Sequence, residues 1–263
     1  MSDAWNPATY NRFATERSQP FHDLLALIQP GGIRSAVDLG CGTGELTRLA
    51  TRQLEIGAML GVDNSPQMLA ETDHIADPNT RFALGEIAAW TGPPRFDLVL
   101  ANASLQWVPD HAQVLRRWTA ALAPEGQLAV QVPANAQMPS HVVAREVANY
   151  PQFAAAFGAD GPPPDPVAQN VLEPQEYAEL LFGLGFQDQH VRLQVYPHVL
   201  DSSRGVVDWV RGTMLTRFQQ CLDPETFTEF VSVYEQRLIQ VIGDRAPYFF
   251  PFRRILLWGR LAR

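Results

Sequence analysis

The sequence predicts an α/β fold, in which a doubly wound, mostly parallel sheet of seven strands carries helical insertions. Short apolar runs alternate with helical segments up to about residue 132, which is the pattern of parallel β–α–β units. Three glycines at alternate positions follow the first apolar run. Beyond Pro133 the alternation breaks, and mainly helical segments accompany two further apolar runs. A chain of 263 residues is long enough for one large core, because chains of this size bury about three quarters of their unfolded surface.

Each expected element follows from its local pattern. Strands are expected over apolar runs at 35–39, 57–62, 81–84, 96–100, 127–132, 186–200 and 252–261. Helices are expected at 45–53, from Pro66 onward, and at 112–122, 138–157, 174–184, 206–220 and 224–242. Pro66 suits a first helical turn, Pro151 interrupts the helix that surrounds it, and Gly185 caps the end of another. The helical stretches at 134–172 and 201–250 are therefore predicted insertions near the carboxyl edge of the sheet, where such folds bind ligands.

Composition narrows the classes of partner. The net charge is −8, with 46% hydrophobic and 18% charged residues, which is a globular composition without the positive charge that suits nucleic acid or an anionic membrane. No apolar run approaches the roughly 20 residues that cross a bilayer, and the N-terminus lacks the basic and apolar regions of a secretory signal. Two cysteines, Cys41 and Cys221, suit reduced thiols. We expect a soluble cytoplasmic protein with no nucleic-acid partner, no membrane association and no obligate protein partner.

The residues most informative about function lie between the first strand and the first helix, in Val37-Asp38-Leu39-Gly40-Cys41-Gly42-Thr43-Gly44. Glycine permits a positive φ and lets the backbone approach a ligand closely. Asp63 ends the second strand, about 20 residues further on, where an acid accepts hydrogen bonds from ribose hydroxyls. The alternatives are a mere tight turn for the glycines and, for Asp63 followed by Asn64-Ser65-Pro66, a helix N-cap.

Asp38 distinguishes between the nucleotides that such a loop could hold. A dinucleotide places its pyrophosphate at this turn, where an adjacent carboxylate repels it. S-adenosylmethionine has no phosphate and brings a sulfonium and an ammonium, which a carboxylate attracts. The glycine spacing is also G-x-G-x-G, with Glu45 where a dinucleotide site has its third glycine. The pattern favours S-adenosylmethionine as the cofactor; the alternative for Asp38 is a purely structural carboxylate at the strand end.

The run 38–44 and the run Gly61-Val62-Asp63-Asn64-Ser65-Pro66-Gln67-Met68 resemble class I S-adenosylmethionine-dependent methyltransferases, which have a Rossmann-like fold. Other stretches resemble the trans-aconitate 2-methyltransferase branch, so the resemblance covers nearly the whole chain. These stretches are Trp5-Asn6-Pro7 with Tyr10, Glu16-Arg17-Ser18 and Pro20, and the ranges 101–111, 141–148 and 208–210. The proline-rich stretch 161–166 departs from the pattern. We predict one methyltransferase domain over 1–263, with an N-terminal helical cap segment at 1–30, a cofactor-binding half at 31–133 and cap insertions at 134–172 and 201–250.

The resemblance also implies where the cofactor binds. Asp38 and the glycines line its methionine end, Asp63 binds the ribose, and Glu86 faces the adenine amino group, with an exposed loop acid as the alternative for Glu86. Asn102 and Gln106 are expected in a loop that faces the substrate. The full set of expected cofactor-binding residues is Tyr10, Arg17, Asp38, Gly40, Cys41, Gly42, Gly44, Asp63, Asn64, Ser65, Met68, Glu86, Ile87, Asn102, Ser104 and Gln106.

The reaction implied by the resemblance is O-methylation of a carboxylate of trans-aconitate, which yields the monomethyl ester and S-adenosylhomocysteine. A carboxyl group with a pKa of about 4 is ionised at neutral pH, so we expect no general base, only alignment and exclusion of water. A small polycarboxylate is best held by arginines, whose planar forks match carboxylates; a structural salt bridge is the alternative for each. The expected substrate-binding residues are Trp107, Arg145, Trp209, Tyr248, Arg253 and Arg254.

Two further expectations concern these side chains. Because side chains alternate along a strand, Arg253 and Arg254 should point to opposite faces of the sheet, and only one should reach the substrate. The six histidines and two cysteines show no ligand spacing, so we expect no metal.

Several other functions remain open at this stage. The acceptor could be another small acid or a malonyl thioester. A dinucleotide-binding oxidoreductase is disfavoured by Asp38 and the glycine spacing. A nucleic-acid methyltransferase is disfavoured by the acidic charge and by the Ala-Ser that follows Asn102, where an N-P-P-Y-like sequence would be expected. A non-catalytic binding module fits poorly with so complete a set of motifs.

Overall fold

The computed structural model describes residues 14–72, 74–93 and 95–262. The chain divides into two compact units. The sheet unit comprises Arg17–Ala134, Asn170–Gln194 and Arg253–Arg263. The described part of the helical unit comprises residues 14–16, Asn135–Gln169 and Val195–Phe252. The finer subdivision made from the sequence, with its cap segment and cap insertions, stays a prediction.

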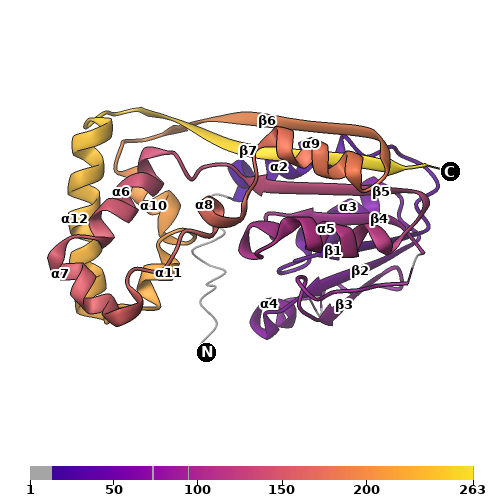
Figure 1. Ribbon diagram of the computed structural model, residues 1–263, viewed down its shortest axis with the longest axis horizontal. Coiled ribbons are helices and arrows are strands. Elements are labelled where there is room, and N and C mark those ends of the chain that lie inside the picture. Colours follow the sequence, from indigo (N-terminus) through magenta and orange to yellow (C-terminus); the bar gives the residue numbers. More distant parts are fainter. Residues whose placement is uncertain (1–13, 73, 94, 263) are drawn as a thin grey trace. The chain divides into compact units, whose positions relative to one another are not determined.

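The described residues form one sheet of seven strands in the order β3-β2-β1-β4-β5-β7-β6 (Figure 1). The strands are β1 (Ser35–Leu39), β2 (Ala58–Asp63), β3 (Thr80–Leu84), β4 (Phe96–Asn102), β5 (Leu122–Pro133), β6 (Phe186–Leu200) and β7 (Tyr248–Leu261). The first five strands pair in parallel, and β7 pairs antiparallel to β5. The predicted α/β class and the mostly parallel, seven-stranded sheet are therefore confirmed. The strand order reverses between β1 and β4, and ligands of doubly wound sheets bind at such a point.

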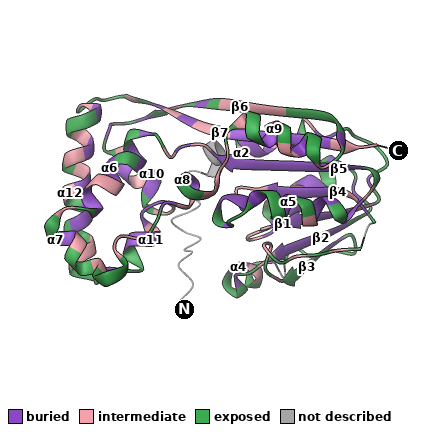
Figure 2. Ribbon diagram, in the orientation of Figure 1, coloured by how far each residue is buried: buried purple, intermediate pink, exposed green. Residues whose placement is uncertain are grey.

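Alternating side chains on the central strands give the sheet two apolar faces. On β4, Leu98 and Leu100 pack on one face, which we call the α3 face, with helices α2 (Ala14–Leu25) and α3 (Glu45–Gln53). Val99 and Ala101 pack on the opposite face, the α5 face, with helices α5 (His111–Ala120) and α9 (Pro174–Gly183). The central strands are accordingly buried on both sides (Figure 2), as expected of a parallel sheet covered by helices.

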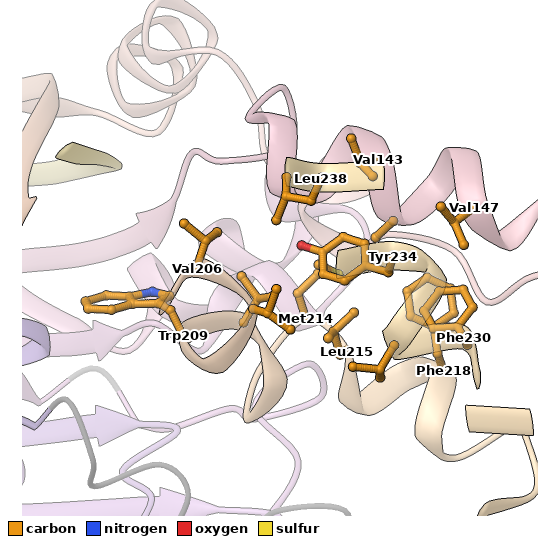
Figure 3. Close-up of a cluster of buried hydrophobic side chains, with 14 of the residues drawn as sticks. Val143, Val147, Val206, Trp209, Met214, Leu215, Phe218, Phe230, Tyr234 and Leu238 are labelled. Carbon is orange, nitrogen blue, oxygen red and sulfur yellow. The ribbon is translucent and has the colours of Figure 1, made fainter. Parts of the chain in front are cut away.

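The helical unit has a core of its own. Its helices are α6 (Pro139–Ala148), α7 (Pro151–Ala154), η2 (Ala155–Asp160), α8 (Pro166–Asn170), α10 (Gly205–Arg211), α11 (Thr216–Gln219) and α12 (Pro224–Ile242). Phe218, Phe230 and Tyr234 lie together at the centre of this core (Figure 3). The Phe218 and Phe230 ring centroids are 4.7 Å apart. The buried apolar side chains of α12 therefore pack in a cluster of their own unit and not against the sheet.

Four element predictions need correction. The fifth strand begins at Leu122 and not at 127. The helix expected at 206–220 is two helices, α10 and α11, because the first ends at Gly212. The last strand begins at Tyr248 and not at 252. Helix α8 begins at Pro166, beyond the proline-rich loop, where no helix was expected. The interruption at Pro151 is confirmed, because that proline starts α7. None of the described helices is both long enough and apolar enough to cross a membrane.

Candidate active site

The glycine loop joins β1 to α3 and is held against the end of β2. The backbone N–H groups of Gly40 and Cys41 both donate to the carbonyl of Val62, over 2.7 and 3.1 Å. The φ angles of Gly40, Gly42 and Gly44 are +87°, +56° and +79°, a region that L side chains rarely adopt. The three glycines are therefore required by the shape of the loop.

Packing separates the roles of these glycines. A Cβ on Gly40 would lie 2.2 Å from the Cβ of Ser104, and one on Gly44 would lie 2.6 Å from a ring carbon of Phe82. A Cβ on Gly42, by contrast, would have no described atom within 4 Å. Gly40 and Gly44 are thus needed for internal packing, whereas Gly42 presents bare backbone to open space.

Asp63 connects the glycine loop to the next helix. Its Oδ2 accepts a hydrogen bond from the Gly42 N–H at 2.8 Å, and its Oδ1 accepts one from the Ser65 N–H at 2.9 Å. The N-cap of α4 (Pro66–Ala70) is Ser65, whose Oγ accepts from the Met68 N–H. Asp63 is therefore not the N-cap of this helix. Each carboxylate oxygen has a second lone pair for a ligand hydroxyl.

Asp38 is buried beneath the loop with one oxygen available. Its Oδ2 accepts from the hydroxyl of Thr47 at 2.6 Å, whereas its buried Oδ1 has no hydrogen-bond partner among the described residues. Burial raises the pKa of Asp38 to about 7; the Thr47 hydrogen bond opposes this shift and the charge of Asp63 adds to it. A carboxyl group in this position gains most from a cation beside Oδ1, because a nearby positive charge favours the ionised form.

The residues expected near an adenine have local partners. The Asn64 Nδ2 donates to both oxygens of Glu86, at 3.2 and 3.3 Å, and both side chains are exposed. The carbonyl of Ile87 accepts from the indole N–H of Trp118. Cys41 is buried, and burial raises the pKa of its thiol, so the sulfur stays protonated.

The loop after β4 is folded by its own side chains. Ser104 donates from Oγ to the carbonyl of Leu39 at 2.6 Å, which joins this loop to the end of β1. The Gln106 Nε2 donates to the carbonyl of Ala103 at 2.6 Å. The buried Oδ1 of Asn102 and Oε1 of Gln106 lack a donor within the described chain. Two acceptors are thus left available near the switch point.

Gln131 is a candidate residue that sequence reasoning missed. It lies on β5 in register with Asn102, on the α3 face, and is 1% exposed. Its Nε2 is buried and, as far as the chain is described, has no acceptor. Gln127, on the same strand and face, is different, because its amide bonds with the backbone of Gln29 and with Trp258. The available signal was a second glutamine near the carboxyl end of an apolar strand.

The two arginines of β7 lie on opposite faces. Ile255 packs on the α5 face and Leu256 on the α3 face, so by alternation Arg253 belongs to the former and Arg254 to the latter. Arg254 is paired in register with Pro133, two residues beyond Gln131. Of the two, Arg254 therefore shares a face with the polar side chains described above.

The other expected substrate residues lie in different places. Trp107 is 43% exposed and follows β4 in the sheet unit. Arg145, Trp209 and Tyr248 belong to the helical unit. Arg145 donates to Asp165 and to the carbonyl of Ala136, Trp209 is buried against Phe250 and Phe252, and Tyr248 is half-buried.

Two expected cofactor residues cannot be placed. Tyr10 lies outside the described residues, as does the side chain of Arg17. Where the structure describes the chain, no three His, Cys, Asp or Glu side chains are grouped so that they could hold a metal ion.

The described geometry suits a nucleoside ligand with a cationic tail. Bare backbone at Gly42 lies beside a carboxylate that can accept from two hydroxyls, and a buried carboxyl lies beneath the same loop. A polyphosphate would meet two acidic side chains here, whereas a sulfonium and an ammonium would be attracted.

Comparison with known proteins shows similarity to methyltransferases over nearly the whole chain. A family model described as a methyltransferase domain matches residues 36–126. The trans-aconitate 2-methyltransferase of Delftia acidovorans is 40% identical over 267 residues, covering 98% of this chain and 96% of that protein. The trans-aconitate 2-methyltransferases of Deinococcus radiodurans and Mycobacterium tuberculosis are 39% and 34% identical to this chain. Each alignment covers 96% of this chain and at least 95% of the relative.

Solved structures support the fold. The YcgJ protein from Bacillus subtilis matches with a TM-score of 0.61 at 14% identity, over 93% of this chain and 98% of that one. A Haemonchus contortus phosphoethanolamine N-methyltransferase, solved with phosphomonomethylethanolamine and S-adenosylhomocysteine, matches with a TM-score of 0.57 at 16% identity, over 92% of this chain and 52% of that one. The predicted Rossmann-like fold is thereby confirmed. Because similarity to curated relatives extends over nearly its full length, the chain belongs to the trans-aconitate 2-methyltransferase family of S-adenosylmethionine-dependent methyltransferases.

Proposed function

We propose that this enzyme transfers a methyl group to a carboxylate of trans-aconitate and releases the monomethyl ester. The observation that carries the proposal is the near full-length similarity, at 34–40% identity, to relatives named trans-aconitate 2-methyltransferase. The methyl donor is S-adenosylmethionine, which supplies an electrophilic methyl group on its sulfonium. The acceptor oxygen attacks that methyl group, and S-adenosylhomocysteine leaves.

The residues of the sheet unit fit this cofactor. We propose that Asp38 faces its cationic end, because the unpartnered Oδ1 is the kind of acceptor that an ammonium needs. Gly40, Cys41, Gly42 and Gly44 line the same end through their backbone, with open space at Gly42. Asp63 accepts from the ribose hydroxyls. The expected adenine residues are Asn64, Ser65, Met68, Glu86 and Ile87, with Tyr10 and Arg17 as further candidates.

The polar groups at the ends of β4 and β5 are proposed to position the reactants. The Asn102 Oδ1 and the Gln106 Oε1 can accept from the ammonium of the cofactor, while the Gln131 Nε2 can donate to an acceptor carboxylate. Ser104 acts indirectly, since its hydroxyl is used to hold the carbonyl of Leu39. Arg254 lies on the same face and supplies positive charge.

No general base is needed for this acceptor. A free carboxylate with a pKa of about 4 is already ionised at neutral pH, so the protein has only to align the oxygen with the methyl group, exclude water and balance the remaining charges. Within the sheet unit, Trp107 is proposed to shield the acceptor and Arg254 to balance its charge.

Transfer of labelled methyl from S-adenosylmethionine to trans-aconitate tests the proposal. The product should be an ester that mild alkali cleaves, and the rate should be nearly flat above pH 7 because the nucleophile does not titrate there. Other small acids and a malonyl thioester serve as competing acceptors. Alkali-stable incorporation, or a higher kcat/KM for a competing acceptor, would overturn the assignment.

We further propose that the enzyme acts in the cytoplasm on the free acid, without nucleic acid or an obligate protein partner. Both Cys41 and Cys221 are free thiols, which suits a reducing compartment. The net charge of −8 disfavours a polyanionic partner.

A further inference from the structure

A chain of hydrogen bonds within the sheet unit ends on the loop after β4, and the proposed reaction has given it no role. His111, the first residue of α5, is 2% exposed, and Tyr177 of α9 is fully buried. The Nδ1 of His111 lies 2.7 Å from the hydroxyl oxygen of Tyr177, and its Nε2 lies 2.9 Å from the carbonyl oxygen of Leu105. The Tyr177 oxygen accepts a further bond from the N–H of Leu172 at 3.3 Å.

The partners of His111 fix which of its nitrogens carries the hydrogen. A carbonyl oxygen can only accept, so Nε2 donates to Leu105. Burial lowers the pKa of His111, while its bonding to the backbone and the charge of Asp110 oppose this shift, so the imidazole is neutral at pH 7. Nδ1 then accepts from the Tyr177 hydroxyl. The hydrogen bonds therefore run in one direction, from Leu172 to the Leu105 carbonyl.

The Leu105 carbonyl belongs to a loop that packs against the glycine loop. Leu105 begins the short 3-10 helix η1 (Leu105–Trp107). Ser104, one residue earlier, lies against Gly40, where an added Cβ would come within 2.2 Å of the Cβ of Ser104. Gln106, one residue later, carries the Oε1 acceptor that is proposed to face the cofactor. A shift of Leu105 would therefore displace groups on both sides of it.

The same loop begins and ends with residues in an unfavourable backbone conformation. The φ angles of Ala103 and Asp110 are +54° and +53°, in the left-handed region that residues other than glycine rarely adopt. Residues in such regions persist only where the surrounding contacts fix them. Leu105 lies between these two positions along the chain, so the bond that it accepts from His111 is one of the contacts that hold the loop in this shape.

We propose that His111 is a positioning residue for methyl transfer, which holds the loop after β4 in place through the Leu105 carbonyl while Tyr177 orients its ring. It acts on the cofactor through Ser104 and Gln106 and not by a contact of its own. This inference rests on the proposed function, which places Gln106 at the cofactor. Loss of the bond to Leu105 should therefore impair methyl transfer beyond any loss of stability.

Two amide replacements of His111 separate its two hydrogen bonds. The longer glutamine amide reaches the position of Nε2 and donates to Leu105, whereas the shorter asparagine amide reaches the position of Nδ1 and keeps only the Tyr177 contact. Each variant thus loses one buried hydrogen bond, and their melting temperatures should be similar. The kcat of His111→Asn should fall by up to about 100-fold, because a misplacement of about 1 Å can cost that much, whereas the kcat of His111→Gln should stay close to that of the wild type.

Tyr177→Phe makes the same separation without changing the histidine. It removes the bond to Nδ1 and keeps the bond from Nε2 to Leu105, so its kcat should match that of His111→Gln. Gln127→Leu is the matched control for stability, because Gln127 is another buried side chain of the sheet unit that donates to a backbone carbonyl, that of Gln29 at 3.1 Å. This control should melt at a lower temperature and keep the kcat of the wild type.

A binding measurement without turnover separates this inference from the choice of acceptor. S-adenosylhomocysteine is titrated calorimetrically into each variant, and its Kd should rise about 2- to 12-fold in His111→Asn and stay unchanged in His111→Gln and Gln127→Leu. If the wild type does not methylate trans-aconitate, the proposed function fails, and the Kd values still decide the role of His111. If His111→Asn does not fold, the whole series is made in an Ala103→Gly background, which removes the strain at that residue.

Two results would overturn the inference. One is a lower melting temperature with wild-type kcat and Kd in His111→Asn, which would show that the histidine only joins α5 to α9. The other is an equal loss of kcat in His111→Asn, His111→Gln and Tyr177→Phe, which would show that the bond to Leu105 is not the one that positions the loop.

Discussion

A methyl group added at Gly42 tests whether the open space at the glycine loop belongs to the cofactor. Alanine at this position adopts a φ of +56° with no described atom within 4 Å of its Cβ. The cost to folding is therefore conformational, about 1–2 kcal/mol. If the cofactor occupies that space, the methyl group overpacks the complex by about 1–3 kcal/mol, which weakens S-adenosylhomocysteine binding about 5- to 150-fold.

Two other glycines supply matched controls. Gly32 has a φ of +75° and likewise no described atom within 4 Å of a Cβ, so Gly32→Ala should lower stability as Gly42→Ala does and leave affinity unchanged. Gly40→Ala combines a φ of +87° with a Cβ only 2.2 Å from that of Ser104. Strain and overlap together should lower its stability by about 2–5 kcal/mol.

Denaturant unfolding and calorimetric titration of S-adenosylhomocysteine resolve the two effects. The reasoning predicts a large loss of stability for Gly40→Ala and a selective loss of affinity for Gly42→Ala. Equal affinities for Gly42→Ala and Gly32→Ala would refute it, because the space at Gly42 would then not be occupied by the cofactor.

Four further outcomes concern residues of the sheet unit. The pKa of Asp38 in the folded protein is raised to about 7, so the folded protein keeps a proton that the unfolded chain loses above about pH 4. The free energy of unfolding therefore falls as the pH rises between these two values. Asp38→Asn should flatten this pH dependence in unfolding titrations. Binding of S-adenosylmethionine at pH 6 should release that proton from Asp38. Calorimetry in two buffers of different ionisation enthalpy would show the release, and equal binding heats in the two buffers would contradict a cationic partner for Asp38. Gln131→Leu should raise the acceptor KM with little change in stability, whereas Gln127→Leu should mainly destabilise; the reverse pattern in kinetics and melting would count against a site at Gln131. Arg254→Met should raise the acceptor KM about 10- to 150-fold and Arg253→Met should not, so that equal KM values for the two variants would exclude a role for the α3 face.

The parts of the fold that were predictable depend on local pattern. The strand at 35–39 and the helix at 45–53 match the structure at both ends, because apolar spacing and the glycine loop between them are contained in neighbouring residues. The last strand was expected too late because Pro251 interrupts its apolar run, and proline argues against a strand. The break at Gly212 is local too, but helical spacing on both sides concealed it.

The site was harder to predict from the sequence, because its side chains pair with residues that are far away along the chain. Arg145 looked available, yet its partner Asp165 lies 20 residues away, within the proline-rich stretch 161–166. Gln131 and Gln127 belong to the same strand, and only the tertiary partners of Gln127 distinguish them. The glycine motif was informative because its residues are consecutive in the sequence.

The double attachment of Asp63 limits what can replace it. An asparagine has nearly the same size, but it offers one carbonyl oxygen and one NH2 group in place of two acceptors. Whichever way the amide turned, its NH2 group would face a backbone N–H, either that of Gly42 or that of Ser65. The change would therefore release either the glycine loop or the start of α4. The proposed ribose contact therefore cannot be redesigned without disturbing the glycine loop. A search for altered nucleoside preference is better directed at Asn64 and Glu86, which are exposed and bonded to each other.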